Sequence, residues 1–206
     1  MIEAMSRKTA ELFVKNGLVA EEEKNVYEYG MEFLISTLFS TLMVLVIGLA
    51  AGLFTETLFL LVPFYCIRVY AGGYHAENYR NCFLSFCWGF IVVLLAAEKV
   101  VACHAEAEIM MFELLAVLLI WKLAPVEDHS RPLDLEEWRT YQRKARMMTL
   151  ICGVVSELMY FLWGIEYAVY VSAAVTAIGL VLIVGIIKNR IIGFTGTVRY
   201  DKDSNM

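Results

Sequence analysis

The sequence predicts an all-α integral membrane protein with about six transmembrane helices, and three observations support this prediction. Hydrophobic residues make up 60% of the 206 residues and charged residues only 19%, and the mean hydropathy is +0.63. The apolar residues fall in blocks of roughly the length that crosses a bilayer core, ~20 residues of helix. Lys and Arg gather in alternate connections between these blocks, which is the pattern of a multi-pass protein with short loops.

Six apolar runs follow one another along the chain. The second and fourth runs are short, so a tilted, broken or re-entrant segment is an alternative there. The predicted spans are residues 31–52, 55–71, 82–102, 109–125, 147–164 and 167–187. Together they form the transmembrane bundle, residues 31–187, of a single predicted domain, residues 1–206.

The N-terminal segment, residues 1–30, precedes the first span and has an amphipathic pattern. Apolar side chains such as Leu12 and Leu18 alternate with charged ones such as Lys8 and Lys15. This pattern predicts a helix that lies on the inner membrane surface, and a solvated cytoplasmic helix is the alternative.

The distribution of basic residues predicts that both termini are cytoplasmic. With six spans, every Lys and Arg except Lys99 falls on the inner side, and the C-terminal tail, residues 188–206, contributes four of them. Loops rich in Lys and Arg stay in the cytoplasm. An inverted or five-span topology would break this separation of basic residues between the two sides of the membrane. The predicted outer loops instead carry Glu56, Glu98, Glu106, Glu108 and Glu166.

The connection between the second and third spans holds the most informative residues. Gly72 and Gly73 break the helix and allow backbone angles closed to other residues. His75 follows them, and Cys82 opens the next apolar run, with Asn78 or Asn81 available as its N-cap. A neighbouring His and a helix N-terminus both favour the thiolate that cysteine catalysis requires.

This pairing has a geometric condition. In one unbroken helix, His75 and Cys82 would stand ~10.5 Å apart along the axis. A dyad within one chain therefore needs His75 in a turn or loop that folds back over the third span, or else the two residues meet across a dimer. Spacing alone also leaves a chance pairing open, since Cys103 and His104 are another adjacent pair.

At these residues the sequence resembles the accessory gene regulator B (AgrB) family of Gram-positive bacteria. The resemblance rests on the pattern Arg68, Gly72, Gly73, His75, Ala76 and Cys82. It also covers the length of the chain, its six apolar runs, and the basic inner loop that opens at Ala124-Pro125. The family consists of membrane-embedded cysteine endopeptidases that process the precursor of a quorum-sensing peptide.

The resemblance implies a mechanism and a partner. Cys82 is expected to be the nucleophile and His75 the general base, at the cytoplasmic face of a bacterial cell membrane. The implied partner is a small peptide precursor (AgrD-like) with an amphipathic leader and a charged C-terminal tail. Cleavage before the tail would leave a thioester on Cys82, and the peptide's own Cys or Ser would close a thiolactone or lactone ring. No cofactor, metal or nucleic acid is implied, and a homodimer is compatible with the resemblance.

Further residues could support the site. Arg68, in the last turn of the second span, could orient Glu77, bind the acidic tail or reach lipid phosphates. Glu77 could orient His75 or be a solvated loop residue, and Ser85 could donate to the site or serve helix packing. Glu113 and Glu157 fall inside predicted spans, where carboxylates are costly; Glu157 could pair with Lys122 or line a polar cleft.

Two other classes of function compete with a peptidase. A non-enzymatic transporter, or a scaffold for a peptide partner, would predict more polar residues within several spans or repeat symmetry between halves. A metal-dependent intramembrane hydrolase built on Glu113 and Glu157 would predict a set of His ligands in the spans. Neither signature is visible in the sequence.

Overall fold

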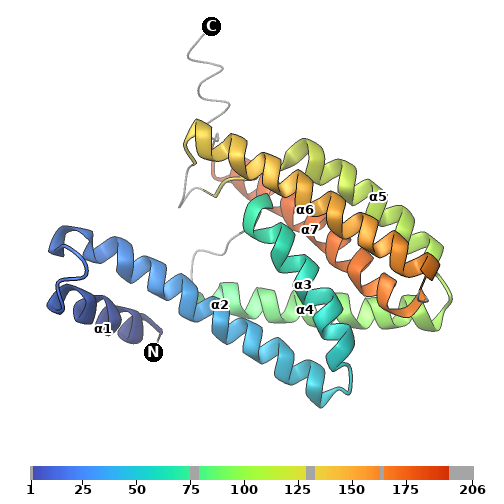
Figure 1. Ribbon diagram of the computed structural model, residues 1–206, viewed down its shortest axis with the longest axis horizontal. Coiled ribbons are helices and arrows are strands. Elements are labelled where there is room, and N and C mark those ends of the chain that lie inside the picture. The colour runs from blue at the N-terminus through green and yellow to red at the C-terminus, as the bar shows by residue number, and fades with distance from the viewer. Residues whose placement is uncertain (1, 75–78, 129–132, 163–164, 195–206) are drawn as a thin grey trace, which may run out of the picture. The chain divides into compact units, whose positions relative to one another are not determined.

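The computed structural model describes residues 2–74, 79–128, 133–162 and 165–194. These residues are almost entirely helical (Figure 1). The chain divides into two compact units, Met1–Gly52 with Ala76–Phe90 and Leu53–His75 with Ile91–Met206. Helix α4, Tyr79–Ala102, contributes residues to both units.

The first unit is built from a short helix packed on a long one. Helix α1, Ile2–Lys15, contacts α2, Lys24–Ala50, and a 3-10 turn, Glu21–Glu23, joins them. Ser6 and Ala10 are the buried residues of α1, whereas Leu12 is exposed. The predicted N-terminal segment thus contains a helix, and the following long helix starts seven residues before the predicted apolar run.

The second unit is a helix bundle with α7, Ile165–Ile191, at its centre. Helix α7 contacts α3, Phe54–Ala71, α5, Glu106–Leu123, and α6, Leu135–Leu162 (Figure 1). More than half of its most apolar window is buried. The core lies where these helices meet and consists of Ile67, Ala71, Ala116, Ile120, Ala124, Val126, Ala145, Val175, Ile178 and Leu182.

All six predicted apolar runs form helices. Among the described residues, five helices are long and apolar enough to cross a membrane, namely α2, α3, α4, α6 and α7. The sixth, α5, has the required 18 residues but carries Glu106, Glu108, Glu113 and Lys122. Large apolar side chains such as Leu38, Val92 and Leu118 are exposed on these helices, as expected of surfaces that face lipid.

Helix α6 begins 12 residues before the apolar run from which it was predicted. The Asp134 carboxylate accepts a hydrogen bond from the Leu135 N–H at 2.8 Å, and the Glu137 carboxylate accepts one from the Asp134 N–H at 3.5 Å. The bond from the Asp134 N–H to Glu137 is one half of a capping box, and together the two bonds satisfy amide groups that the helix itself leaves free. Much of the predicted inner loop is therefore a charged extension of α6 rather than irregular chain.

Candidate functional site

The glycine pair ends helix α3, as predicted. Gly72 has φ 68° and Gly73 φ 110°, values that strongly favour glycine. The Val126 N–H donates to the Ala71 carbonyl and the Gly73 N–H donates to the Val126 carbonyl, both at 2.9 Å. A single parallel β-bridge between Gly72 and Val126 results. It fixes the chain after α3 against the segment that follows α5, and a Cβ on Gly72 would collide with the Val126 carbonyl.

Helix α7 holds the other side of the same segment. The Tyr74 N–H donates to the Val181 carbonyl at 3.3 Å. One turn further along α7, Gly185 lies so close that an added Cβ would sit 2.7 Å from the Tyr74 nitrogen and 2.8 Å from the Gly73 carbonyl carbon. Glycine at position 185 is therefore what allows the segment from Gly72 to Tyr74 to lie against the helix.

Arg68 closes this arrangement from α3. Its Nη2 donates to the Tyr74 carbonyl oxygen at 2.5 Å, and its Nη1 would lie 3.0 Å from a Cβ on Gly73. A hydrogen bond from a charged donor is about twice as strong as one between neutral groups. Arg68 therefore fixes the residue that immediately precedes His75 in the chain.

A polar cluster at the C-terminal end of α7 completes the surroundings of Tyr74. Lys188 Nζ lies 3.3 Å from Asp128 Oδ2 and 5.5 Å from the centre of the Tyr74 ring. Asn189 Nδ2 donates to the Glu127 carbonyl at 2.7 Å. Sequence reasoning missed this cluster because Lys188 was assigned to a solvated tail, whereas α7 continues to Ile191. The available signal was the spacing of Val181, Gly185 and Lys188, which places them on one face of a helix.

Cys82 lies close to the N-terminal end of α4 as the structure describes it. The described range of that helix starts at Tyr79, so Cys82 is the fourth residue of that range. Its side chain is half-buried. Asn81 lies inside the helix, so the prediction that it could be the N-cap is wrong; Asn78 is outside the described residues. The Ser85 hydroxyl donates to the Cys82 carbonyl oxygen at 3.0 Å, a bond within the helix.

The structure thus brings Arg68, Gly72 and Gly73 together in one unit, and Cys82 and Ser85 together on α4. His75 and Glu77 fall outside the described residues. Helix α3 ends at Ala71, residues 72–74 are not helical, and α4 is described from Tyr79. The geometric condition for a dyad of His75 and Cys82 therefore falls on residues outside the described ranges.

The comparison with known families covers every site residue named above. The model of the family described as "Accessory gene regulator B" matches residues 6–192, which is nearly the whole chain. The chain belongs to the AgrB family. Membership supports a role in the processing of a quorum-sensing peptide, in which members of the family act with an AgrD-like precursor.

Individual AgrB-like proteins are similar over most of their length. A putative AgrB-like protein 2 of Clostridium perfringens strain 13 is 27% identical over 175 residues, which cover 78% of this chain and 79% of the relative. A putative AgrB-like protein of C. perfringens strain SM101 is 28% identical, with 80% and 81% covered. One from Halalkalibacterium halodurans is 25% identical, with 79% and 82% covered. No solved structure matches the chain.

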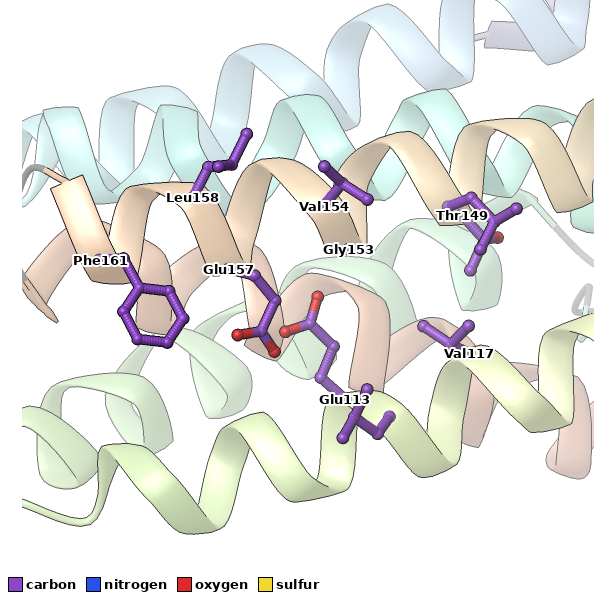
Figure 2. A pocket seen from close by; sticks show the side chains of 10 residues that line it. Glu113, Val117, Thr149, Gly153, Val154, Glu157, Leu158 and Phe161 are labelled. Carbon is purple, nitrogen blue, oxygen red and sulfur yellow. The ribbon is translucent and has the colours of Figure 1, made fainter.

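This AgrB family member also buries a carboxylate between three helices. Glu113 of α5 is 1% exposed and accepts hydrogen bonds from the hydroxyls of Ser156 on α6, at 3.0 Å, and Ser172 on α7, at 2.7 Å. Glu157 lines a pocket together with Glu113 (Figure 2). Among the described residues no ion pair joins Glu157 to Lys122, and the pocket that Glu157 lines is mainly apolar rather than the polar cleft considered as the alternative.

Proposed function

We propose that this chain is a membrane-embedded cysteine endopeptidase that removes the C-terminal tail of a small autoinducer-peptide precursor and supports its cyclisation. The observation that carries the proposal is the match to the AgrB family over residues 6–192. Two structural details support it: Cys82 lies near the N-terminal end of α4, and the residue before His75 is held by hydrogen bonds from two directions. Both termini are proposed to be cytoplasmic, which puts this motif at the inner face.

The position of Cys82 suits a nucleophile. It lies near the N-terminal end of α4, Tyr79–Ala102, and the N–H groups and dipole of a helix N-terminus favour negative charge. The same N–H groups could donate to the oxyanion that forms when the thiolate attacks a carbonyl. In this proposal His75 takes the thiol proton, a role that needs an imidazole held within reach of the sulfur.

The chemical steps balance without a cofactor. The Cys82 thiolate attacks the carbonyl carbon of the peptide bond before the tail, and the C–N bond of the tetrahedral intermediate breaks. His75 gives its proton to the departing amine, and a thioester joins the remaining peptide to Cys82. A Cys or Ser of the peptide then gives its proton to the now neutral His75 and attacks the thioester, the Cys82 thiolate leaves, and a thiolactone or lactone ring closes. Excluding water preserves the acyl bond for this second step.

The held segment gives His75 a fixed starting point. The Ala71 carbonyl and the Gly73 N–H bond to Val126 on one side, and the Tyr74 N–H bonds to the Val181 carbonyl on the other. Arg68 bonds to the Tyr74 carbonyl. A general base contributes only when its position relative to the nucleophile is restricted, because misplacement by about 1 Å can cost ~100-fold in rate. The proposed support residues are therefore Arg68, Gly72 and Gly73, with Glu77 as a candidate to orient His75.

Replacement of Cys82 tests the proposal. The chain is co-expressed with the small open reading frame next to its gene, and the peptide products are measured by mass spectrometry. Cys82→Ala should abolish cleavage while the protein still inserts in the membrane at the normal level. Cys87→Ala, a change at a buried cysteine on the same helix, is the matched control and should keep cleavage. Full processing by Cys82→Ala would refute the peptidase.

A thiol-reactive probe supplies a second test that needs no substrate. Cys82 should react faster than the other four cysteines, because its thiolate is favoured. His75→Ala should remove that preference without changing the reactivity of Cys66, an exposed cysteine. Equal reaction rates at Cys82 in both proteins would show that His75 does not act on the thiol.

A further inference from the structure

The carboxylate of Glu113 is satisfied on one oxygen only. Oε2 accepts hydrogen bonds from the hydroxyls of Ser156 and Ser172, and these two hydroxyls also contact one another at 2.7 Å. Oε1 is buried and has no hydrogen-bond partner among the residues that the structure describes. The two serine hydroxyls thus anchor one oxygen and leave the other facing away from them.

Ionised Glu113 leaves Oε1 as a buried acceptor without a donor among the described residues. A proton on Oε1 would need the neighbouring Glu157 carboxylate as its acceptor, and the charge of that carboxylate would then stay uncompensated. Unpaired polar groups are most costly inside a membrane-spanning bundle, where water does not replace the missing partner. The group that completes this carboxylate is therefore one that donates a hydrogen bond to Oε1.

The second carboxylate shows which kind of donor fits. Figure 2 shows the carboxyl groups of Glu113 and Glu157 pointing toward one another, close enough for their negative charges to interact. Within the described ranges, no ion pair joins a Lys or Arg to either group. An uncompensated charge in a bundle is expensive, so the two groups stay ionised together only when a positive charge accompanies them.

The pocket above the two carboxylates sets the shape of the ligand. Its volume is about 290 Å³, at the lower end of the ~300–1,000 Å³ that is usual for small-molecule sites. Apart from the two Glu residues and Thr149, its walls are glycine and apolar side chains: Leu114, Val117, Gly153, Val154, Leu158 and Phe161 are among them. A short hydrocarbon chain fits such walls, and a charged head fits only at the carboxylates.

We propose that the pocket between α5 and α6 binds a primary ammonium group carried on an apolar chain, with the N–H groups donated to Glu113 Oε1 and the Glu157 carboxylate. Ser156 and Ser172 are positioning residues that fix Glu113 for this contact. The site does not include Cys82 or the segment from Gly72 to Tyr74, so it is independent of peptide cleavage. Two sources could present this chemistry: a free alkylamine, or the Lys side chain of a membrane-inserted peptide.

Protection from a carboxyl reagent tests the site. The full chain in lipid nanodiscs is treated with dicyclohexylcarbodiimide, an apolar reagent, and the label on Glu113 is measured by mass spectrometry. Octylammonium at about ten times its dissociation constant should slow labelling by about tenfold, as one-site occupancy requires. Octanol, with the same chain and no charge, should leave the rate unchanged. Absence of label on Glu113 under all conditions would show that the pocket is closed, and would overturn the proposal.

Two variants separate the ammonium site from a merely apolar groove. Gly153→Ala adds a methyl group 3.8 Å from Glu113 Oε1 and 3.7 Å from Val117 Cγ2, which are ordinary contacts that the fold accommodates. It should abolish protection by octylammonium while Glu113 still reacts. Gly89→Ala is the control, because its Cβ would meet nothing within 4 Å, and it should keep full protection. Glu157→Gln should weaken protection by removing one of the two charges.

The remaining outcomes decide the ligand and its source. Equal protection by octanol and octylammonium, or unchanged protection in Gly153→Ala, would overturn the ammonium site. A hydrophobic membrane-spanning peptide with one central Lys, compared with the same peptide carrying norleucine, tests the second source. Protection by the Lys peptide alone, or by octylammonium alone, identifies which one presents the group. Cys82→Ala should bind octylammonium as well as the native chain, so failure of the peptidase proposal leaves this test intact.

Discussion

Gly185 of α7 lies in backbone contact with Gly73, with room for a hydrogen atom but not for a methyl group. A Cβ on Gly185 would be 3.0 Å from the Gly73 Cα and 2.8 Å from its carbonyl carbon. Both partners are backbone atoms that cannot rotate away. The distance between α7 and the segment that leads to His75 therefore depends on the absence of a side chain at position 185.

Gly185→Ala should therefore impair cleavage without touching the proposed dyad. The methyl group must push Gly73 and Tyr74 away from α7. Overpacking of this kind destabilises a fold by about 1–3 kcal/mol. Precursor cleavage per inserted molecule should fall by at least about tenfold, because displacement of a catalytic base by about 1 Å can cost ~100-fold. Gly89→Ala, which meets nothing within 4 Å, should cleave normally. Normal cleavage by Gly185→Ala at normal protein level would show that this contact does not position the site.

The Lys188–Asp128 ion pair should contribute to both stability and cleavage. Its side chains are only 19% and 11% exposed, with 3.3 Å between Nζ and Oδ2, so removal of one partner leaves a poorly solvated charge. Lys188→Met and Asp128→Asn should each lower the unfolding temperature, and their effects should not add, with a coupling of about 0.5–3 kcal/mol. Lys122→Met, at an exposed Lys of α5, is the control. Strictly additive effects would show that the pair is not an energetic unit.

Ser85→Ala should have a small effect. The Ser85 hydroxyl bonds to the carbonyl of its own helix, three residues back, and the residue is exposed. Such local bonds contribute little, and exposed substitutions usually change stability by no more than about 0.5 kcal/mol, roughly a factor of two. Cleavage should stay within about twofold of the native rate, measured beside protein level. A much larger loss, with the protein level unchanged, would make Ser85 part of the proposed site.

Cys103 should report the orientation of the chain. It is exposed in the connection between α4 and α5, and the positive-inside partition puts that connection outside. In intact cells, a membrane-impermeant maleimide should label the native chain, and Cys103→Ser should remove that label. A cysteine introduced at Gly193, also exposed, should react only after permeabilisation. The reverse pattern would invert the proposed topology.

The start of α6 shows where hydropathy alone falls short. Residues 135–146 carry too many charges to belong to an apolar run, so their helix was predicted as loop. The signal that marks the true start is the capping pair of Asp134 and Glu137, a pattern of two polar residues three apart. Such a local pattern could have been read from the sequence, whereas the burial of Ala145 and Thr149 against neighbouring helices could not.

The candidate site likewise contains some residues that the sequence reveals and others that only the structure reveals. Arg68, Gly72, Gly73, His75 and Cys82 were recognisable from their spacing. Val126, Val181, Gly185 and Lys188 come from two distant segments; the spacing of the last three places them on one helix face, but nothing in the sequence says which segment that face contacts. Their importance comes from backbone hydrogen bonds and close approach, which carry no side-chain signature. The carboxylate of Glu113 was noticed for its cost in a membrane, but its serine partners were not.

The sequence by itself determined that this is a multi-helix membrane protein, which family motif it carries, and which residues could react. These properties depend on local composition and on spacing along one chain. Inside a bilayer the backbone polar groups of an apolar segment must bond to one another, which leaves few alternatives to a helix. Tertiary structure decided which segments hold the glycine pair and which hydroxyls anchor the buried carboxylate. Those contacts join residues 40 to more than 100 positions apart, and only the packing of α3, α5, α6 and α7 brings them within hydrogen-bond distance.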